Sequence, residues 1–297
     1  MNFGNVPVKD LDRLDLTLPP EPGQNEKILA KAGKAGKTKF YTGLGKWGRK
    51  EFVGVLYPKG TKEKDFAELY LKHFNSIELN ATHYKLFDEK VIQSWADKSA
   101  GTDFKFCPKV YQGISHFGAL SDKKFLTDVF TKNIRAFGKQ LGPVLFQVSD
   151  KFGPKRKQEL LDYLELLPDD IQFFLEIRHP EWFEDGFDKD LLKALIKLKI
   201  GAVITDAAGR RDACHMYLTV PKVFIRYVGN DLHKTDYTRI DEWAERLQYW
   251  QQHGLKEAFF FPHPGDEKYG PEMAQYVVKQ LNKKCNAGLK PVELLGK

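Results

Sequence analysis

A carboxylate, a guanidinium and an imidazole stand close together where an apolar run of the chain ends. The stretch FFLEIRHPEW covers Phe173 to Trp182. Within it, Glu176 and Arg178 are separated by one apolar residue, so in an extended strand both side chains point to the same face. A carboxylate can act as a general acid or base, and a guanidinium can bind an anion. The pattern therefore predicts a candidate site at the end of a buried strand. His179, beside Pro180, is more typical of a structural role in the loop.

Polar side chains end most of the other β-rich runs as well. In IELN, for example, Glu78 and Asn80 share one face while apolar residues occupy the other. The residues expected to point inward at such ends are Glu78, Asn80, Lys109, Gln147, Glu176, Arg178, Asp206, Arg226 and His263. A buried ion costs several kcal/mol unless it is paired. We therefore expect the charged members to pair with one another and to bind an ionic or polyhydroxyl ligand. The alternative is that they only neutralise each other.

Eight β-rich runs supply these ends. They lie near residues 39–43, 74–80, 104–109, 144–148, 171–177, 200–206, 222–227 and 257–261. Amphipathic helical patterns separate most of them, with Asp88 and Asp188 as expected caps and one long helix expected over 121–141. The link after 200–206 lacks a clear helix. Alternating strands and helices predict parallel pairing.

The first run leads into GLGKWG, which lacks the GxGxxG spacing of a dinucleotide-binding turn. This favours an α/β fold of the TIM type, a (β/α)8 barrel that is irregular around its sixth unit. Catalytic groups in such barrels lie at the carboxyl ends of the strands. We expect an irregular N-terminal extension over 1–37, a single barrel domain over 38–284 and a tail over 285–297. The tract from Ala30 to Lys37 is expected to be mobile.

Composition limits the class of protein. The 297 residues carry a net charge of +7, but the lysines are spread along the chain, which is more typical of a solvated surface than of a polyanion site. No apolar run approaches the roughly 18 residues of a membrane span. The N-terminus has no signal-peptide pattern, and the three cysteines are isolated. These features predict a cytoplasmic protein with no membrane partner, no disulfide and no zinc site.

Several stretches, taken in order, resemble an uncharacterised family, domain-of-unknown-function family 72. They are GLGKW followed by LYP, FNSIELNATHY, FKFCPKV with a downstream Ser-His pair, LGPVLFQV and FLEIRHPEWF. The resemblance covers about residues 38–284 and implies a TIM barrel without implying a reaction. It adds Trp47, Tyr84 and His116 to the candidate ligand-binding residues. Near the eighth run, FPHPG stands where the family tends to have paired asparagines, so no role of those asparagines is transferred.

The favoured function is that of an enzyme, a hydrolase, lyase or isomerase, acting on a small polar or anionic metabolite. Glu78 or Glu176 would serve as acid or base. Lys109, a further catalytic candidate, would hold negative charge on the substrate or transition state together with Arg178 and Arg226.

Three alternatives stay open. Glu78, Glu176, Asp206 and His263 are suitable ligand types for a divalent metal, but three cations at the same mouth disfavour one, so no cofactor is predicted. A nucleic-acid-binding or nuclease-like barrel would use the basic stretches at 151–157 and 209–212, with Trp47 and Tyr84 as stacking surfaces. A barrel that binds a ligand without catalysis is the third.

Overall fold

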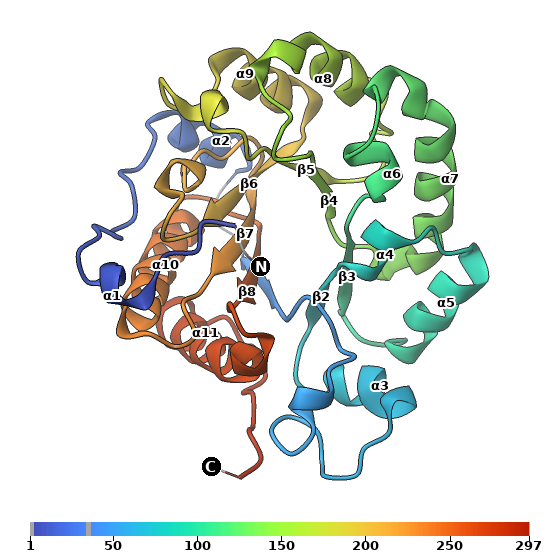
Figure 1. Ribbon diagram of the computed structural model, residues 1–297, viewed down its shortest axis with the longest axis vertical. Helices are drawn as coiled ribbons and strands as arrows, with labels where there is room; N and C mark the ends of the chain where they lie inside the picture. Colours follow the sequence, from blue (N-terminus) through green and yellow to red (C-terminus); the bar gives the residue numbers. More distant parts are fainter. Residues whose placement is uncertain (1–2, 34–36, 297) are drawn as a thin grey trace.

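The computed structural model describes residues 3–33 and 37–296, which form a TIM-type barrel of eight parallel strands inside a ring of helices (Figure 1). The strands are β1 (Lys39–Thr42), β2 (Ser76–Leu79), β3 (Lys105–Pro108), β4 (Val144–Gln147), β5 (Phe173–Glu176), β6 (Gly201–Asp206), β7 (Lys222–Val228) and β8 (Glu257–His263). Each coincides with one of the eight predicted runs, and the predicted fold is confirmed.

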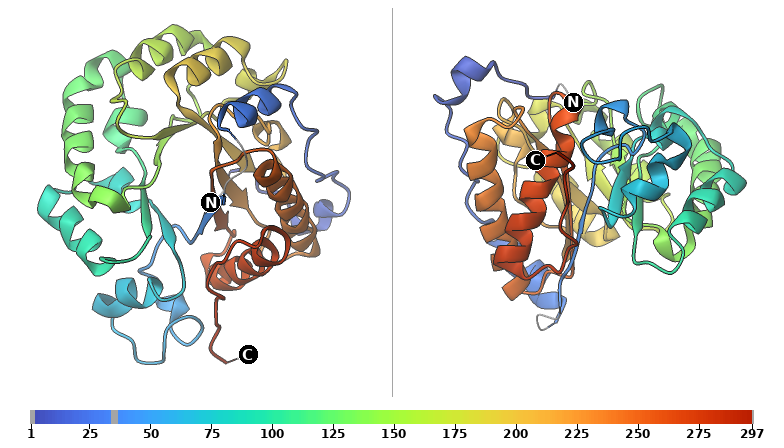
Figure 2. Two further views of the ribbon diagram at one scale, coloured as in Figure 1. Left: turned by 180° about the vertical axis from the view of Figure 1, so that it is seen from behind. Right: turned by 90° about the horizontal axis from the view of Figure 1, so that it is seen from below.

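The helices follow the strands as the periodicity predicts. After the N-terminal α1 (Val8–Leu11) and α2 (Gln24–Lys31) come α3 (Phe66–Tyr70), α4 (Ala81–Tyr84), α5 (Glu89–Lys98), α6 (Gln112–Ser115), α7 (Lys124–Ile134), α8 (Lys157–Leu164), α9 (Lys189–Leu198), α10 (Lys234–Gln252) and α11 (Gly270–Cys285). Asp88 and Asp188 both cap helices by accepting backbone N–H hydrogen bonds. Figure 2 shows α10 and α11 side by side against the strands.

Of two further helical predictions, one needs correction and one is confirmed. The single helix expected over 121–141 is divided into α7 and flanking 3-10 turns, and within the second turn Gly138 adopts a φ of 54° that a helix cannot contain. The link after β6 contains only a short 3-10 turn, Arg211–Ala213, so the predicted irregularity of the sixth unit is confirmed.

Alternation along the strands separates two apolar regions. Side chains on the outer face pack against the helices and form the large core. Those on the inner face form a smaller cluster that fills the lumen: Tyr41, Cys107, Leu145, Phe174, Val203, Val220, Phe224, Phe259 and Phe261. Six of these nine lie two residues before a polar side chain at the carboxyl end of their own strand. The lumen therefore has an apolar lower part and a polar upper part.

The barrel is closed unevenly. Strands β1, β8, β7, β6, β5 and β4 form one continuous ladder, and β2 pairs with β3 in a second. Isolated bridges, including Lys109 to Leu145, join β3 to the β4 side. Between β1 and β2 the Asn75 side chain forms the link, accepting from Thr42 N at 2.9 Å and donating to Phe40 O at 2.8 Å. We call this junction the seam.

The N-terminal extension, which the sequence predicts to be irregular, includes two short helices. It contains α1 and α2, and its Asn25 side chain is buried, bonding Met216 O and Leu218 N at 2.8 Å each. Of the tract expected to be mobile, residues 34–36 lie outside the described residues, whereas Ala30 and Lys31 belong to α2. At the other end of the chain, Leu289 and Val292 are buried against the barrel.

Candidate functional site

The upper lumen holds a polar layer, which we define as Glu78, Lys109, Gln147, Glu176, Thr205, Arg226 and His263. These residues come from six strands, β2 and β4 to β8, and from the end of β3. Each stands at or near the carboxyl end of its strand, above the apolar lumen cluster. Most are buried, so their charges must be balanced within the layer. The sequence-based prediction that polar groups from distant strands meet at this end describes the arrangement well.

Arg226 lies at the centre of the layer. Its Nε and Nη2 each donate to one carboxylate oxygen of Glu78 at 2.8 Å, and its Nη1 donates to Glu176 Oε2 at 2.7 Å. A two-point contact of this kind fixes both the distance and the orientation of the two planar groups. Arg226 therefore holds the two carboxylates of the layer in one arrangement.

The second carboxylate oxygen of Glu176 also accepts hydrogen bonds. Its Oε1 accepts from Arg178 Nε at 2.8 Å and from Thr205 Oγ1 at 3.0 Å. Burial alone would raise the pKa of this carboxyl, but the cations of Arg178, Arg226 and Lys109 outweigh burial and lower it to about 2. Glu176 is therefore a carboxylate throughout the neutral range and is unsuited to donate a proton there.

Glu78 is held in a similar way. Besides Arg226, its oxygens contact Asn80 Nδ2 at 3.0 Å and His263 Nε2 at 3.0 Å. Burial opposes its charge, yet Arg226 and His263 bring the pKa of Glu78 well below its usual range. Both glutamates predicted to act as acid or base are thus ionised acceptors whose oxygens already have donors.

Lys109 has the least stabilised charge of the layer. Its Nζ donates to the neutral Gln147 Oε1 at 2.8 Å, and no carboxylate of the described residues forms an ion pair with it. Burial and the nearby Arg226 lower the pKa of Lys109 to about 8, against the opposing effect of Glu176 and Glu78. Its ammonium can therefore exchange a proton close to neutral pH.

The charged groups around the lumen do not sum to zero. Lys109, Arg178 and Arg226 supply three positive charges, and Glu78 and Glu176 supply two negative ones. Asp150, at the rim, is 3.4 Å from Arg178 but largely exposed to solvent, which screens its charge. The buried part of the site is therefore left with a surplus positive charge.

Two histidines extend the site beside Lys109. His83 and His116 contact each other with ring centroids 4.8 Å apart, and His116 Nδ1 lies 2.8 Å from Ser115 Oγ. Burial and the charge of Lys109 lower the pKa of both rings, that of His83 to about 4. Both are therefore neutral at pH 7. His116, a candidate from the family resemblance, lies within electrostatic reach of the layer.

The N-terminal segment lies over this mouth. The Phe3 ring stacks on the guanidinium of Arg178 at 4.5 Å and on that of Arg210 at 4.8 Å. Gly4 O accepts from Gly209 N at 2.8 Å. The dark blue trace starts beside β7 and leads outward to α1 (Figure 1). This cover belongs to a part of the chain for which the sequence suggested no site residue.

Asp206 is misplaced by the sequence-based prediction. It faces the helices rather than the lumen, and it accepts from Trp243 Nε1 at 2.7 Å and pairs with Arg239 at 2.9 Å, both on α10. The residue of β6 that reaches the layer is its neighbour Thr205, because the face alternates along the strand. The four side chains suggested as metal ligands therefore do not converge, and no metal-ligating group of three or more acidic, His or Cys side chains occurs in residues 3–33 and 37–296.

Two aromatic candidates also lie away from the layer. Trp47 packs on the outer face, with ring centroids 5.6 Å from Trp95 and 6.5 Å from Phe106. Tyr84 is 67% exposed, and its ring contacts His83. Neither side chain contacts the polar layer in the described structure. Trp47 therefore has a packing role in the described structure.

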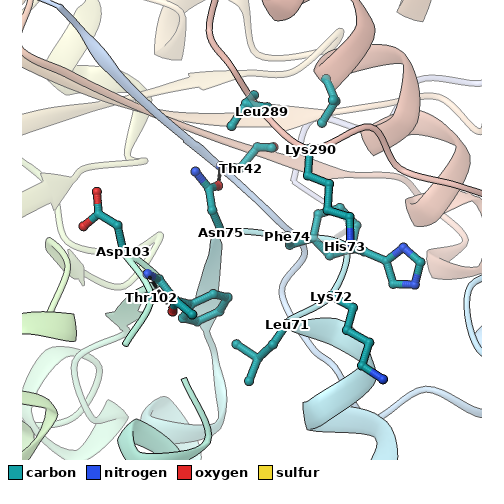
Figure 3. Close-up of a pocket in the computed structure, with 12 residues that line it drawn as sticks. Thr42, Leu71, Lys72, His73, Phe74, Asn75, Thr102, Asp103, Leu289 and Lys290 are labelled. Atoms are coloured by element: carbon teal, nitrogen blue, oxygen red, sulfur yellow. Dashed lines mark hydrogen bonds between the residues drawn. The ribbon is translucent and has the colours of Figure 1, made fainter. Parts of the chain in front are cut away.

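Two of the cavities near the strands bear on the position of the site. One of about 230 Å³ occupies the seam, where Asn75 extends toward Thr42 (Figure 3). None of the polar-layer residues lines it, so it is separate from the candidate site. A smaller cavity of about 50 Å³ lies at the carboxyl mouth, and its wall includes Asn80 and His263. We call this second one the mouth cavity.

Residues 41–293 match the model of a family described as "Protein of unknown function DUF72". The chain belongs to the DUF72 family. This confirms the resemblance seen in the motifs, and DUF72 itself is a family of unknown function. Within residues 3–33 and 37–296 we find no helix whose length and apolar character would allow it to cross a bilayer.

Two named relatives are similar in sequence to this chain over about half of its length or more. The UPF0759 protein YecE of Escherichia coli K12 is 28% identical over 263 residues, which is 82% of this chain and 93% of the relative. The UPF0759 protein YunF of Bacillus subtilis is 27% identical over 160 residues, 52% of this chain and 55% of the relative. Neither name specifies a reaction.

Crystal structures of two DUF72 proteins have the same fold. The protein from Enterococcus faecalis superposes with a TM-score of 0.65 at 18% identity, covering 87% of this chain and 98% of that one. The protein from Thermotoga maritima gives 0.62 at 20% identity, covering 84% and 99%. At these identities the likeness supports the fold and says nothing of a ligand.

Proposed function

We propose that this barrel is an enzyme that binds a small polar metabolite carrying a negative charge and transfers a proton through Lys109. The observation that carries the proposal is the position of Lys109: buried to 8% exposure among ionised groups, bonded to a neutral amide, and near the end of a barrel strand. Keeping an ammonium there without a carboxylate partner is costly unless a bound anion relieves the cost. Amines with lowered pKa values are typical of general acids, general bases and nucleophiles.

The charge of the site supports an anionic ligand. Three cations oppose two carboxylates around the lumen, and one negative charge on a ligand would balance them. Arg178 lies at the mouth under the Phe3 ring, so its guanidinium is placed between the entrance and Glu176. Glu78 and Glu176 would then hold the cations in place rather than react, because both are ionised and saturated with hydrogen bonds.

In the basic stretches that motivated a nucleic-acid partner, several cations are already paired with carboxylates, which favours a small ligand over a nucleic acid. Arg156 pairs with Glu159 at 2.7 Å, and Lys157 pairs with Asp188 at 3.1 Å. Arg210 pairs with Asp212 at 2.7 Å. Cations already matched by neighbouring carboxylates contribute little to the phosphate contacts on which nucleic-acid affinity depends.

Thermal unfolding in the presence of small anions tests the proposal. We expect at least one compound from a panel of carboxylates and phosphorylated sugars to raise the Tm of the wild-type protein. Lys109→Met should abolish the shift. Lys105→Met is the matched control, because Lys105 lies on the same strand at its amino end, and it should retain the shift. A compound that stabilises Lys109→Met as well as the wild type would contradict the proposal.

A stabilising compound then serves as the test substrate. Its conversion can be followed by proton NMR, including loss of signal by exchange in deuterium oxide. We expect conversion by the wild type and the Lys105→Met control, and none by Lys109→Met. Binding without any conversion or exchange would instead favour a barrel that only binds its ligand.

A further inference from the structure

His263 ends β8 with one ring nitrogen committed to Glu78. Its Nε2 lies 3.0 Å from Glu78 Oε2, and the side chain is 11% exposed. The oxygens of Glu78 also accept from Arg226 and Asn80, at 2.8 and 3.0 Å. Every group around this carboxylate is therefore a donor, and the carboxylate itself has no proton to give.

This arrangement fixes the position of the ring proton. Because Glu78 is ionised and can only accept, the hydrogen between the two residues belongs to His263 Nε2. Burial and the neighbouring Arg226 lower the pKa of His263, against the opposing effect of Glu78, so the ring carries this single proton at neutral pH. The lone pair of the neutral ring is then on Nδ1.

The ring of His263 borders a small cavity. The mouth cavity of about 50 Å³ is lined by His263 together with Gly45, Lys46, Asn80 and Glu267. A methyl group placed on Gly45 would be 3.6 Å from His263 Cε1 and 3.9 Å from Nδ1, so this edge points at the cavity wall formed by Gly45. Among the described residues no hydrogen-bond donor contacts Nδ1.

We propose that His263 is a general base, with Nδ1 accepting a proton from a substrate group seated in the mouth cavity, and that Glu78 is its positioning residue. The inference deepens the proposed function and rests on it. The substrate bond to hydrogen breaks, its electron pair stays on the substrate, and the proton forms an imidazolium whose charge Glu78 balances. The substrate class is a small anion with an acidic C–H or hydroxyl group near the end that enters this cavity.

Other charges also face the ring. Arg226 lies behind Glu78, while Lys46 and Glu267 lie on the cavity side and pair loosely at 3.9 Å. Arg226 disfavours a second proton on the resting imidazole, and Glu78 favours it once the substrate has released one. The ring is therefore placed between opposing charges, which suits a group that takes up and returns a proton.

Nitrogen NMR of the full chain labelled with ¹⁵N-histidine tests the position of the proton directly. At pH 7 we expect His263 to be neutral and protonated on Nε2. His215 is an internal reference, because its Nε2 lies 2.9 Å from Val203 O and its Nδ1 accepts from Tyr217 N, which imposes the same tautomer. In Glu78→Gln the tautomer of His263 should become mixed while that of His215 is unchanged. A ring protonated on Nδ1, or on both nitrogens, overturns the inference.

The cavity is tested by filling it. Gly45→Ala should slow the reaction of His263 with diethylpyrocarbonate, measured by mass spectrometry, because the added methyl lies beside the free nitrogen. Its nearest contact is the end of the Asn80 side chain at 2.8 Å, which must shift and thereby lengthens its hydrogen bond to Glu78. Gly48→Ala is the matched control, since its methyl would meet open space. Equal slowing in both variants, or in neither, overturns the role of the cavity.

The two proposals can fail separately. If an anion stabilises the wild type and loses its effect in Lys109→Met while His263 is protonated on Nδ1, the proposed function stands and this inference is overturned. If His263 has the expected tautomer and no anion stabilises the protein, the proposed function fails, while the arrangement of His263 and Glu78 is supported. With a substrate in hand, His263→Gln should lower kcat by about 100-fold or more with little change in KM.

Discussion

Arg226 and Glu78 form a two-point ion pair with both contacts at 2.8 Å, although 148 residues separate them in the chain. The pair crosses the lumen from β7 to β2 and is completely buried. Charges in such surroundings are stable only together, because either one alone would lose its hydration without compensation. The fold and the site therefore depend on the same contact.

Removing the cation of this pair is expected to be costly. Arg226→Met leaves Glu78 and Glu176 buried without their shared partner, and we expect a loss of about 3–5 kcal/mol in the free energy of unfolding. Urea denaturation monitored by circular dichroism measures it. The matched control is Arg135→Met, because Arg135 makes a similar two-point contact with Asp170 in an exposed position.

An exposed pair contributes little, so Arg135→Met should cost less than about 1 kcal/mol. Equal losses in the two variants would contradict the view that burial makes the Arg226 contact important. A small loss for Arg226→Met that is accompanied by a raised pKa of Glu78 would show that the layer responds by taking up a proton instead.

Lys109 gives the stability a characteristic pH dependence. Its pKa is about 8 in the folded protein and about 10.4 in an unfolded chain, so between these pH values the unfolded state binds more protons. The free energy of unfolding should therefore rise with pH over this interval, by about 3 kcal/mol from this group, and the cost of the buried charge is fully present below pH 8. Lys109→Met should lack this rise and equal or exceed the wild type in stability at pH 7.

The comparison needs a lysine without such surroundings. Lys193, whose side chain is 78% exposed, supplies it: Lys193→Met should follow the wild-type pH dependence. Urea denaturation of the three proteins between pH 7 and 10.5 gives the difference directly. Parallel curves for the wild type and Lys109→Met would show that the folded-state pKa of Lys109 is not lowered.

Phe3 is expected to limit access to the polar layer. Its ring covers Arg178 at the mouth, so Phe3→Ala should increase the rate at which Lys109 is acetylated by an activated ester at pH 8, as measured by peptide mass spectrometry. Val8→Ala is the control, because Val8 belongs to the same segment but its side chain is exposed. If Lys109 reacts at the same rate in all three proteins, the N-terminal segment does not control entry.

Much of the fold follows from sequence because barrel units repeat local patterns. Asp88 and Asp188 precede apolar periodicity and cap helices, and every predicted strand is found. Gly138 shows the limit of this approach. A single residue with positive φ divides a helix whose apolar stripe continues through it, and a hydrophobic pattern alone does not reveal that.

The site is predictable where strand register is unambiguous. Glu176 and Arg178 flank an apolar residue that must face the helices, so both were placed correctly toward the mouth. The predicted inward position of Asp206 is wrong. The end of GAVITD offers two adjacent polar residues, and the inward one, Thr205, carries no charge. Side chains two residues apart in a strand share a face, so Thr205 lies on the same face as Val203 and Asp206 on the opposite one. Phe3 had no such signal, since its partner Arg178 lies far away in the chain.

Because the strand ladder is interrupted at the seam, the ion pair of Arg226 and Glu78 also helps to hold the two parts of the barrel together. Glu78 belongs to the two-stranded ladder and Arg226 to the six-stranded one, and along one junction between these ladders the Asn75 side chain stands in for a strand-to-strand ladder. Whatever occupies the lumen and competes for Arg226 would therefore also loosen the join between the two parts of the cylinder. Ligand binding and the stability of the barrel wall therefore depend on the same contact, the ion pair of Arg226 and Glu78.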